Sequence, residues 1–289
     1  MKLFDEYRQT SSSIENRLKD ATVKYTDENN DPDILPKILG VLDMTTLEGT
    51  DTESRVEELC RQSRFSLILE NLPDAAAVCV YPTLVRKARR ELEGTGIRVA
   101  SVAGAFPSGQ SSLQVKLLEV RFALEEGADE IDTVISRGKL LEGRHAEVLD
   151  ELSAIRETCS DKILKIILET GELGSVELIR KASEIAILAG ADFIKTSTGK
   201  IPAGASPVSF MVMMDTVSEY LEKTGKSVGI KAAGGIRTTG QALMYARLLV
   251  SLMGDEYLDK NLFRIGASSL AGDLLKSILA SDLTHDIKK

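Results

Sequence analysis

Short apolar runs alternate with longer stretches of helical periodicity along most of the chain. Eight runs of four to six residues have the composition of strands, and they lie at residues 40–43, 77–80, 98–103, 130–134, 163–168, 192–195, 227–231 and 263–266. Helical patterns fill much of the sequence between them, over residues 111–126, 144–158, 175–188 and 239–252. The short runs predict buried strands, and the longer patterns predict helices that pack on them.

Two of the predicted helices end at the same tripeptide before the next strand. The sequence Gly-Ala-Asp occurs at residues 127–129 and again at residues 190–192. Glycine at such a position suits the left-handed backbone that closes many helices. The repetition predicts a recurring joint between helix and strand.

Eight strand–helix units in about 250 residues fit a closed (β/α)8 barrel, the TIM-barrel form of an α/β protein. The rival is a doubly wound open sheet, which would usually carry a Gly-x-Gly-x-x-Gly turn after an early strand, and the chain has none there. We therefore predict a barrel catalytic domain over residues 36–289, preceded by an N-terminal extension over residues 1–35 with a helix near residues 13–25. In such barrels the active site lies at the carboxyl ends of the strands.

The composition narrows the classes of function. The 289 residues include 36 Lys and Arg against 44 Asp and Glu, a net charge of −8, which argues against general nucleic-acid binding. No apolar stretch approaches the ~20 residues of a membrane span, and the N-terminus lacks the apolar core of a signal peptide, so we expect a cytoplasmic protein without a membrane partner. Two histidines, His145 and His285, are too few for a histidine-rich metal site, and the three cysteines are far apart. We expect no metal and no cofactor.

Two lysines end apolar runs where a buried strand should carry apolar residues. Lys195 and Lys231 are each followed by small, hydroxyl-bearing or glycine residues. Burial disfavours the charged amine, and two nearby cations lower each other's pKa. A neutral amine is the nucleophile that Schiff-base chemistry requires. The alternative is a structural charge cluster in which Asp132 and Glu169, on the fourth and fifth strands, neutralise both lysines.

The predicted strands carry other residues that could take part in chemistry. Lys165 is in phase with Glu169 on the fifth strand, so we expect both in one interior network. Asp132 is a candidate for proton transfer through water or a salt-bridge partner of the lysines. Cys79 is more typical of a buried apolar residue than of a nucleophile, because no histidine lies near it to activate it. Asp43 is either a polar wall of the site or the cap of the following turn.

Two glycine-rich and serine-rich loops predict an anion site. Residues 232–238 follow the seventh strand, and residues 266–270 follow the eighth and open a helix. Backbone amides at such turns bind phosphate in many barrels of this kind. The alternative is that Gly234 and Gly235 form only a tight turn and Ser268 only a helix cap. Lys200 and Arg237 are candidate cations for the same anion.

Several of these motifs resemble those of deoxyribose-phosphate aldolase. They run in order from about residue 40 to about residue 275, and they are residues 42–47, 78–82, 127–132, 167–173, 193–200, 231–237 and 263–270. The resemblance implies a metal-free class I aldolase that reversibly cleaves 2-deoxy-D-ribose 5-phosphate into D-glyceraldehyde 3-phosphate and acetaldehyde. It also implies that Lys195 forms the Schiff base, that Lys231 perturbs the pKa of Lys195 and stays charged, and that Asp132 relays protons through water.

The resemblance also implies which residues hold the phosphate. The implied phosphate site consists of Gly199, Lys200, Gly234, Gly235, Gly266, Ser268 and Ser269. The expected wall of the site consists of Asp43, Cys79, Lys165, Thr198 and Arg237. The C-terminal tail, residues 283–289, lacks the terminal tyrosine of some family members. We expect a phosphosugar substrate and a homodimer, and the competing functions are a transaldolase, a phosphosugar isomerase or a non-catalytic phosphosugar-binding protein.

Overall fold

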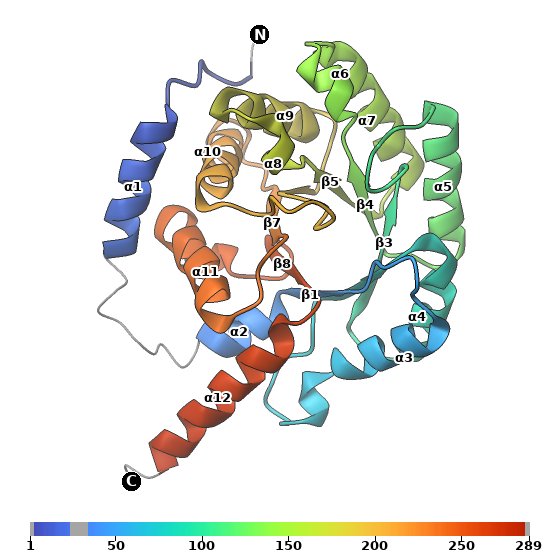
Figure 1. Cartoon of the computed structure of the whole chain (residues 1–289), viewed down its shortest axis with the longest axis vertical. Coiled ribbons are helices and arrows are strands. Elements are labelled where there is room, and N and C mark those ends of the chain that lie inside the picture. Colours follow the sequence, from blue (N-terminus) through green and yellow to red (C-terminus); the bar gives the residue numbers. More distant parts are fainter. Residues whose placement is uncertain (1–2, 24–33, 287–289) are drawn as a thin grey trace.

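The eight predicted strands form a closed parallel barrel in sequence order, which confirms the predicted fold (Figure 1). The computed structural model describes residues 3–23 and 34–286. The strands are β1 Leu42–Thr45, β2 Ala77–Val80, β3 Arg98–Ala103, β4 Glu130–Val134, β5 Ile163–Ile167, β6 Phe193–Lys195, β7 Gly229–Ala233 and β8 Phe263–Ala267. The barrel closes because β8 pairs with β1.

Helices follow the strands and surround the barrel (Figure 1). The α-helices are α1 Ser11–Val23, α2 Ile34–Gly40, α3 Glu53–Gln62, α4 Val85–Glu91, α5 Leu113–Glu125, α6 Arg137–Leu141, α7 His145–Cys159, α8 Thr170–Leu173, α9 Val176–Leu188, α10 Pro207–Thr224, α11 Thr239–Met253 and α12 Leu270–Asp286. Three short 3₁₀ turns are η1 Phe65–Leu67, η2 Pro82–Leu84 and η3 Asp255–Tyr257. The four helical patterns of the sequence are confirmed as α5, α7, α9 and α11. None of the helices within residues 3–23 and 34–286 has the length and apolar character needed to cross a bilayer.

The repeated Gly-Ala-Asp tripeptide forms the same joint twice. Gly127 and Gly190 both have positive φ, 105° and 90°, which glycine adopts without strain. Asp129 then accepts a hydrogen bond from the backbone N–H of Val99 at 2.9 Å, and Asp192 accepts one from Leu164 at 2.8 Å. In each case the aspartate ties the start of one strand to the strand before it.

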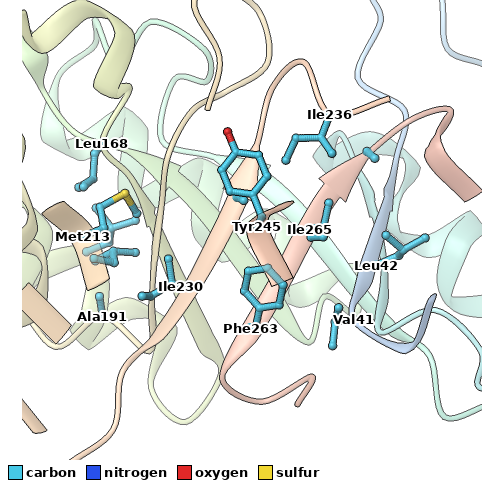
Figure 2. Close-up of a cluster of buried hydrophobic side chains, with 14 of the residues drawn as sticks. Val41, Leu42, Leu168, Ala191, Met213, Ile230, Ile236, Tyr245, Phe263 and Ile265 are labelled. Atoms are coloured by element: carbon cyan, nitrogen blue, oxygen red, sulfur yellow. The ribbon is translucent and has the colours of Figure 1, made fainter. Parts of the chain in front are cut away.

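The main hydrophobic core lies between the outer face of the barrel and its helices. Figure 2 shows Ile230, Phe263 and Ile265 of β7 and β8 close to Tyr245 of α11. Because side chains alternate along a strand, the residue after Ile230 faces the interior. That residue is Lys231. The strand side chains that face the helices are therefore apolar, whereas those that face the barrel interior include charged groups.

The N-terminal segment packs on the outside of the barrel, beside α10 and α11 (Figure 1). Ile14 is fully buried, and Arg17 makes two hydrogen bonds of 2.7 Å to Asp215 of α10. The predicted helix near residues 13–25 is α1, and its expected last two residues lie outside the described part of the chain. The division at residues 35 and 36 stays a prediction, and α2 begins just before it, at Ile34.

Candidate active site

Three side chains from neighbouring strands meet inside the barrel. Lys195 of β6 and Lys231 of β7 are register partners, so their side chains leave the sheet side by side. Both amines donate to the same oxygen of Asp132, Oδ2, and each distance is 2.8 Å. Lys195 is 3% exposed, whereas Lys231 and Asp132 are fully buried. The structure therefore brings together the three residues that the sequence selected for catalysis.

A second set of contacts lies around this group. Lys165 donates to Asp132 Oδ1 at 2.8 Å and lies 3.3 Å from Asp43 Oδ2. Lys231 contacts the same Asp43 oxygen at 2.5 Å. Asp43 therefore bridges two lysines, and because its side chain is fully buried it belongs to the interior network and does not form an exposed wall of the site.

Arg264 and Glu130 complete the interior network, and the sequence analysis missed both. Arg264 donates to Asp43 Oδ1 at 2.5 Å and to Glu130 Oε1 at 2.8 Å, while Glu130 also pairs with Lys165. The signal was present, because Glu130 precedes Asp132 by two positions and therefore faces the same side of β4. Arg264 is also the register partner of Lys231.

The surroundings distinguish the two central lysines. Burial lowers the pKa of Lys195, Asp132 opposes this effect, and the charge of Lys231 adds to the lowering. Burial also acts to lower the pKa of Lys231, but Asp132 and Asp43 outweigh it and raise that pKa above its usual value. Lys195 is therefore the amine that loses its proton more readily, and Lys231 stays a cation.

The surroundings of Asp132 and Cys79 determine whether each side chain is ionised. Burial alone would raise the pKa of Asp132, but Lys165, Lys195 and Lys231 hold it well below the ordinary value. Asp132 is therefore ionised and able to accept a proton. Burial raises the pKa of the Cys79 thiol to about 11, so this fully buried side chain is a neutral thiol at pH 7.

The expected pairing of Glu169 with Lys165 is wrong. Glu169 lies beyond the end of β5 with φ of 54°, so the alternation of the strand no longer applies to it. Its carboxylate accepts hydrogen bonds from the N–H and the hydroxyl of Thr198, at 3.2 and 2.5 Å, and Arg137 lies 3.6 Å away. Glu169 thus anchors the loop after Lys195, and Asp43 and Glu130 join Asp132 in balancing the lysines in its place.

Small hydroxyl residues fix the same loop to β7. The Thr196 hydroxyl accepts from the N–H of Ala233 at 2.9 Å and donates to its carbonyl at 2.9 Å. Ser197 donates to that carbonyl at 2.8 Å. These bonds hold the ends of β6 and β7 together, next to Lys195.

A cavity of about 540 Å³ opens at the carboxyl ends of the strands, and Lys195 lines it. The predicted site residues that share this lining are Thr198, Gly199, Lys200, Gly234, Gly235, Arg237, Gly266 and Ser268. Arg55, at the start of α3, also lines it and was not selected from the sequence, although it follows the first strand on the active face of the barrel. Ser269 instead lines a neighbouring cavity of about 470 Å³.

Two glycines of the cavity wall are required by close approach. A Cβ on Gly234, whose φ is 92°, would lie 2.6 Å from the hydroxyl oxygen of Ser197. A Cβ on Gly266 would lie 2.9 Å from Cε of Lys231, so this glycine leaves room for the lysine. Gly235 in the first loop and Ser268 and Ser269 in the second are exposed, and α12 begins at Leu270, directly after these two serines. Amides at such turns and helix starts bind anions.

Three cations line the same cavity as the glycine loops. Arg55, Arg237 and Lys200 all contribute to the cavity wall, and Lys200 also contacts Glu48 at 2.8 Å across it. An amine in the wall of a cavity that is also lined by cations and by glycine-rich loops suits a carbonyl compound that carries a phosphate.

Comparison with known proteins agrees with this chemistry. A family model described as DeoC/LacD family aldolase matches residues 38–255. The chain belongs to the DeoC/LacD aldolase family. The aldolase is 44% identical to the deoxyribose-phosphate aldolase of Mus musculus over 255 residues, which cover 84% of this chain and 80% of the mouse protein. It is 43% identical to that of Homo sapiens over 256 residues, with the same coverage, 84% and 80%.

A solved structure extends the likeness to the fold. A tetrameric deoxyribose phosphate aldolase from Aeropyrum pernix superposes with a TM-score of 0.68 at 28% identity, covering 90% of this chain and 97% of that one. Both the predicted barrel and the family resemblance are therefore confirmed. The aldolase is a lyase of class I, the metal-independent type.

Proposed function

We propose that this aldolase reversibly cleaves 2-deoxy-D-ribose 5-phosphate into D-glyceraldehyde 3-phosphate and acetaldehyde through a Schiff base on Lys195. The observation that carries the proposal is the position of Lys195. Its amine lies at the cavity wall, shares one oxygen of Asp132 with the Lys231 cation, and faces loops suited to phosphate. The names of the relatives support this choice of substrate.

The residues suggest a role for each step. The neutral amine of Lys195 attacks the C1 aldehyde, and uptake of one proton from solvent with loss of water gives a protonated imine. A water molecule held by Asp132 passes the proton of the C3 hydroxyl to this ionised carboxylate as the C2–C3 bond breaks. The electron pair of that bond moves into an enamine on Lys195, and D-glyceraldehyde 3-phosphate leaves with its new C3 carbonyl. The proton on Asp132 then returns through water to C2 of the enamine, and addition of water to the resulting imine releases acetaldehyde, the free amine and one proton.

Lys231 serves this sequence as a cation. Its raised pKa keeps it protonated, so its charge disfavours a second positive charge on the free Lys195 amine. It also holds Asp132 in place through the shared oxygen. At the far end of the substrate, the phosphate is held by the glycine loops, with Arg55, Lys200 and Arg237 as cations.

We expect acetaldehyde and borohydride to label Lys195. Reduction of the imine leaves an ethyl group on its amine, which mass spectrometry of a digest locates. A coupled assay for D-glyceraldehyde 3-phosphate then tests cleavage of the phosphosugar. Labelling mainly on Lys231 would overturn the assignment of the nucleophile. Binding of phosphosugar without product would instead indicate a non-catalytic binding protein, and formation of an isomer without acetaldehyde would indicate an isomerase.

We expect EDTA to leave the cleavage rate unchanged. The protonated imine accepts the electron pair, so the reaction has no need of a metal ion for that step. Across residues 3–23 and 34–286, no group of three or more His, Cys, Asp and Glu side chains is placed to hold a metal. The measurement is the coupled assay before and after dialysis against EDTA, with zinc added back as the control. Loss of activity that zinc restores would contradict a metal-independent mechanism.

We also propose a homodimer in the cytoplasm. Three apolar side chains, Val115, Leu118 and Phe122, stand out from one face of α5 with exposures of 51%, 59% and 42%. Such a stripe suits burial against a second copy of the chain.

A further inference from the structure

Seven charged side chains are packed together inside the barrel, and their charges do not cancel. The cations are Lys165, Lys195, Lys231 and Arg264, and the anions are Asp43, Glu130 and Asp132. Every one of these side chains is at most 4% exposed. With all groups ionised the cluster carries one positive charge in excess. An uncompensated buried charge is costly, so the cluster favours the loss of one proton.

The number of carboxylate contacts ranks the cations that can give up that proton. Lys165 contacts three carboxylates, those of Asp43, Glu130 and Asp132, and Lys231 contacts two, those of Asp43 and Asp132. Lys195 contacts Asp132 alone among the groups of this cluster. Arginine does not deprotonate in proteins. The geometry therefore directs the loss of the proton to Lys195.

We propose that Arg264 is a positioning residue that keeps the Lys195 amine neutral, by supplying the fixed charge that makes the cations of this cluster exceed its anions. The inference rests on the proposed function and explains how its nucleophile is set. Without Arg264 the cluster has three lysines and three carboxylates, so its charges cancel and Lys195 holds its proton up to a higher pH. A protonated amine has no electron pair with which to attack the substrate.

Arg264 acts through its neighbours and does not line the cavity that Lys195 lines. It binds Asp43, which binds Lys231, and Lys231 shares Asp132 with Lys195. Lys195, Lys231 and Arg264 are also register partners on three adjacent strands, so the backbones of the first and third lie about 10 Å apart. Two charges at that distance in a protein interior shift each other's titration by about one pH unit.

The other charged groups of the interior do not cancel this effect. Arg98 also approaches Glu130, at 3.3 Å, but its side chain is 32% exposed and water screens its charge. Cys79 lies near the lysines as a neutral thiol. The remaining members of the cluster are the carboxylates and lysines already counted, from β1, β4, β5, β6 and β7.

Two measurements on the full chain test the proposal. Trace acetic anhydride acetylates only neutral amines, so labelling of the Lys195 peptide across a pH series reports the neutral fraction even if the chain cleaves no sugar. The rate of imine trapping with acetaldehyde across the same series reports the reactive amine. In Arg264→Met, we expect both curves to move about one pH unit upward, which is about a tenfold loss at a fixed pH on the acidic limb.

Removal of an anion from the same cluster gives the variants that match Arg264→Met. Glu130→Gln removes an anion, so both curves should move to lower pH. The double variant again has one cation in excess, three against two, and should return close to the wild type. Arg264→Lys keeps the charge and should keep the wild-type curve. If Arg264→Met alone does not fold, Glu130→Gln and the double variant still show in which direction a change in the net charge of the cluster moves the two pH curves.

Lys116→Met is the control for simple loss of a buried lysine. Lys116 is fully buried outside the barrel, where it contacts Glu151 at 2.6 Å. We expect it to lower stability without moving either curve. Curves that stay at the wild-type pH in every barrel variant, or that move the same way in both single variants, would overturn the proposal. A wild type that labels normally but releases no D-glyceraldehyde 3-phosphate would instead refute the proposed function.

Discussion

Replacing Lys231 with leucine is expected to lower kcat/KM for the phosphosugar by about 10²–10⁴-fold at pH 7, the range typical of a lost charged group at a reacting centre. Two effects act in the same direction. The charge of Lys231 lowers the pKa of Lys195, so its removal raises that pKa and leaves less neutral amine at pH 7. Asp132 also loses one of the two amines that hold its Oδ2 atom.

The pH profile separates these effects. Imine formation requires neutral Lys195, so the rate falls as the pH drops through the pKa of that amine. In Lys231→Leu this fall should begin at higher pH than in the wild type, while the alkaline plateau reports the loss from misplaced Asp132. The measurement is kcat/KM from pH 5 to pH 9, together with imine trapping over the same range.

Stability has to be measured alongside activity. Breaking a buried ion pair by removing one partner typically costs about 3–5 kcal/mol. Circular dichroism of Lys231→Leu therefore has to show a folded barrel before its rate is interpreted. Lys116→Leu, which removes a buried lysine outside the barrel, is the matched control and should keep the wild-type rate. A folded Lys231→Leu with activity within tenfold of the wild type would show that this cation is not needed.

The fold could be predicted because the strands are recognisable from local sequence patterns. Each β run is short, apolar and bounded by turn or helix signals, so its position is visible without tertiary information. The strand ends shifted by a few residues, as at β7, where pairing with β8 extends the strand to Ala233. That pairing depends on residues distant in sequence, which the local pattern does not contain.

The central residues of the site could be predicted from the sequence, but the contacts between them could not. Lys195, Lys231 and Asp132 stood out because charged residues in apolar runs are conspicuous. The order of their pKa values was not visible, since it depends on the contact of Lys231 with Asp43, which comes from β1 and lies far from both lysines in the sequence. The prediction that Glu169 faces the barrel interior with Lys165 was wrong for another reason. Glu169 has a positive φ, so the alternation of side chains along β5 does not extend to it.

The second large effect expected concerns the phosphate. Unphosphorylated 2-deoxy-D-ribose should be a worse substrate by roughly 10²-fold or more in kcat/KM, since a few charge-assisted hydrogen bonds amount to ~3 kcal/mol or more. The backbone amides of the glycine loops and the cations of the cavity wall are the expected donors of these bonds. Binding of this remote group also helps to place C1 against Lys195, so part of the loss should appear in kcat.

Ser268→Asp tests where that preference originates. Ser268 lines the cavity beside Gly266, so a carboxylate there repels a phosphate and should remove most of the preference for the phosphorylated sugar. Ser268→Ala removes only a hydroxyl and should cost several-fold at most. Ser269→Asp adds the same charge next to it, but Ser269 lines the neighbouring cavity, so we expect a smaller loss. The measurement is the ratio of kcat/KM for the two sugars in each variant. An unchanged ratio in Ser268→Asp would place the phosphate away from this loop, even with Lys195 confirmed as the nucleophile.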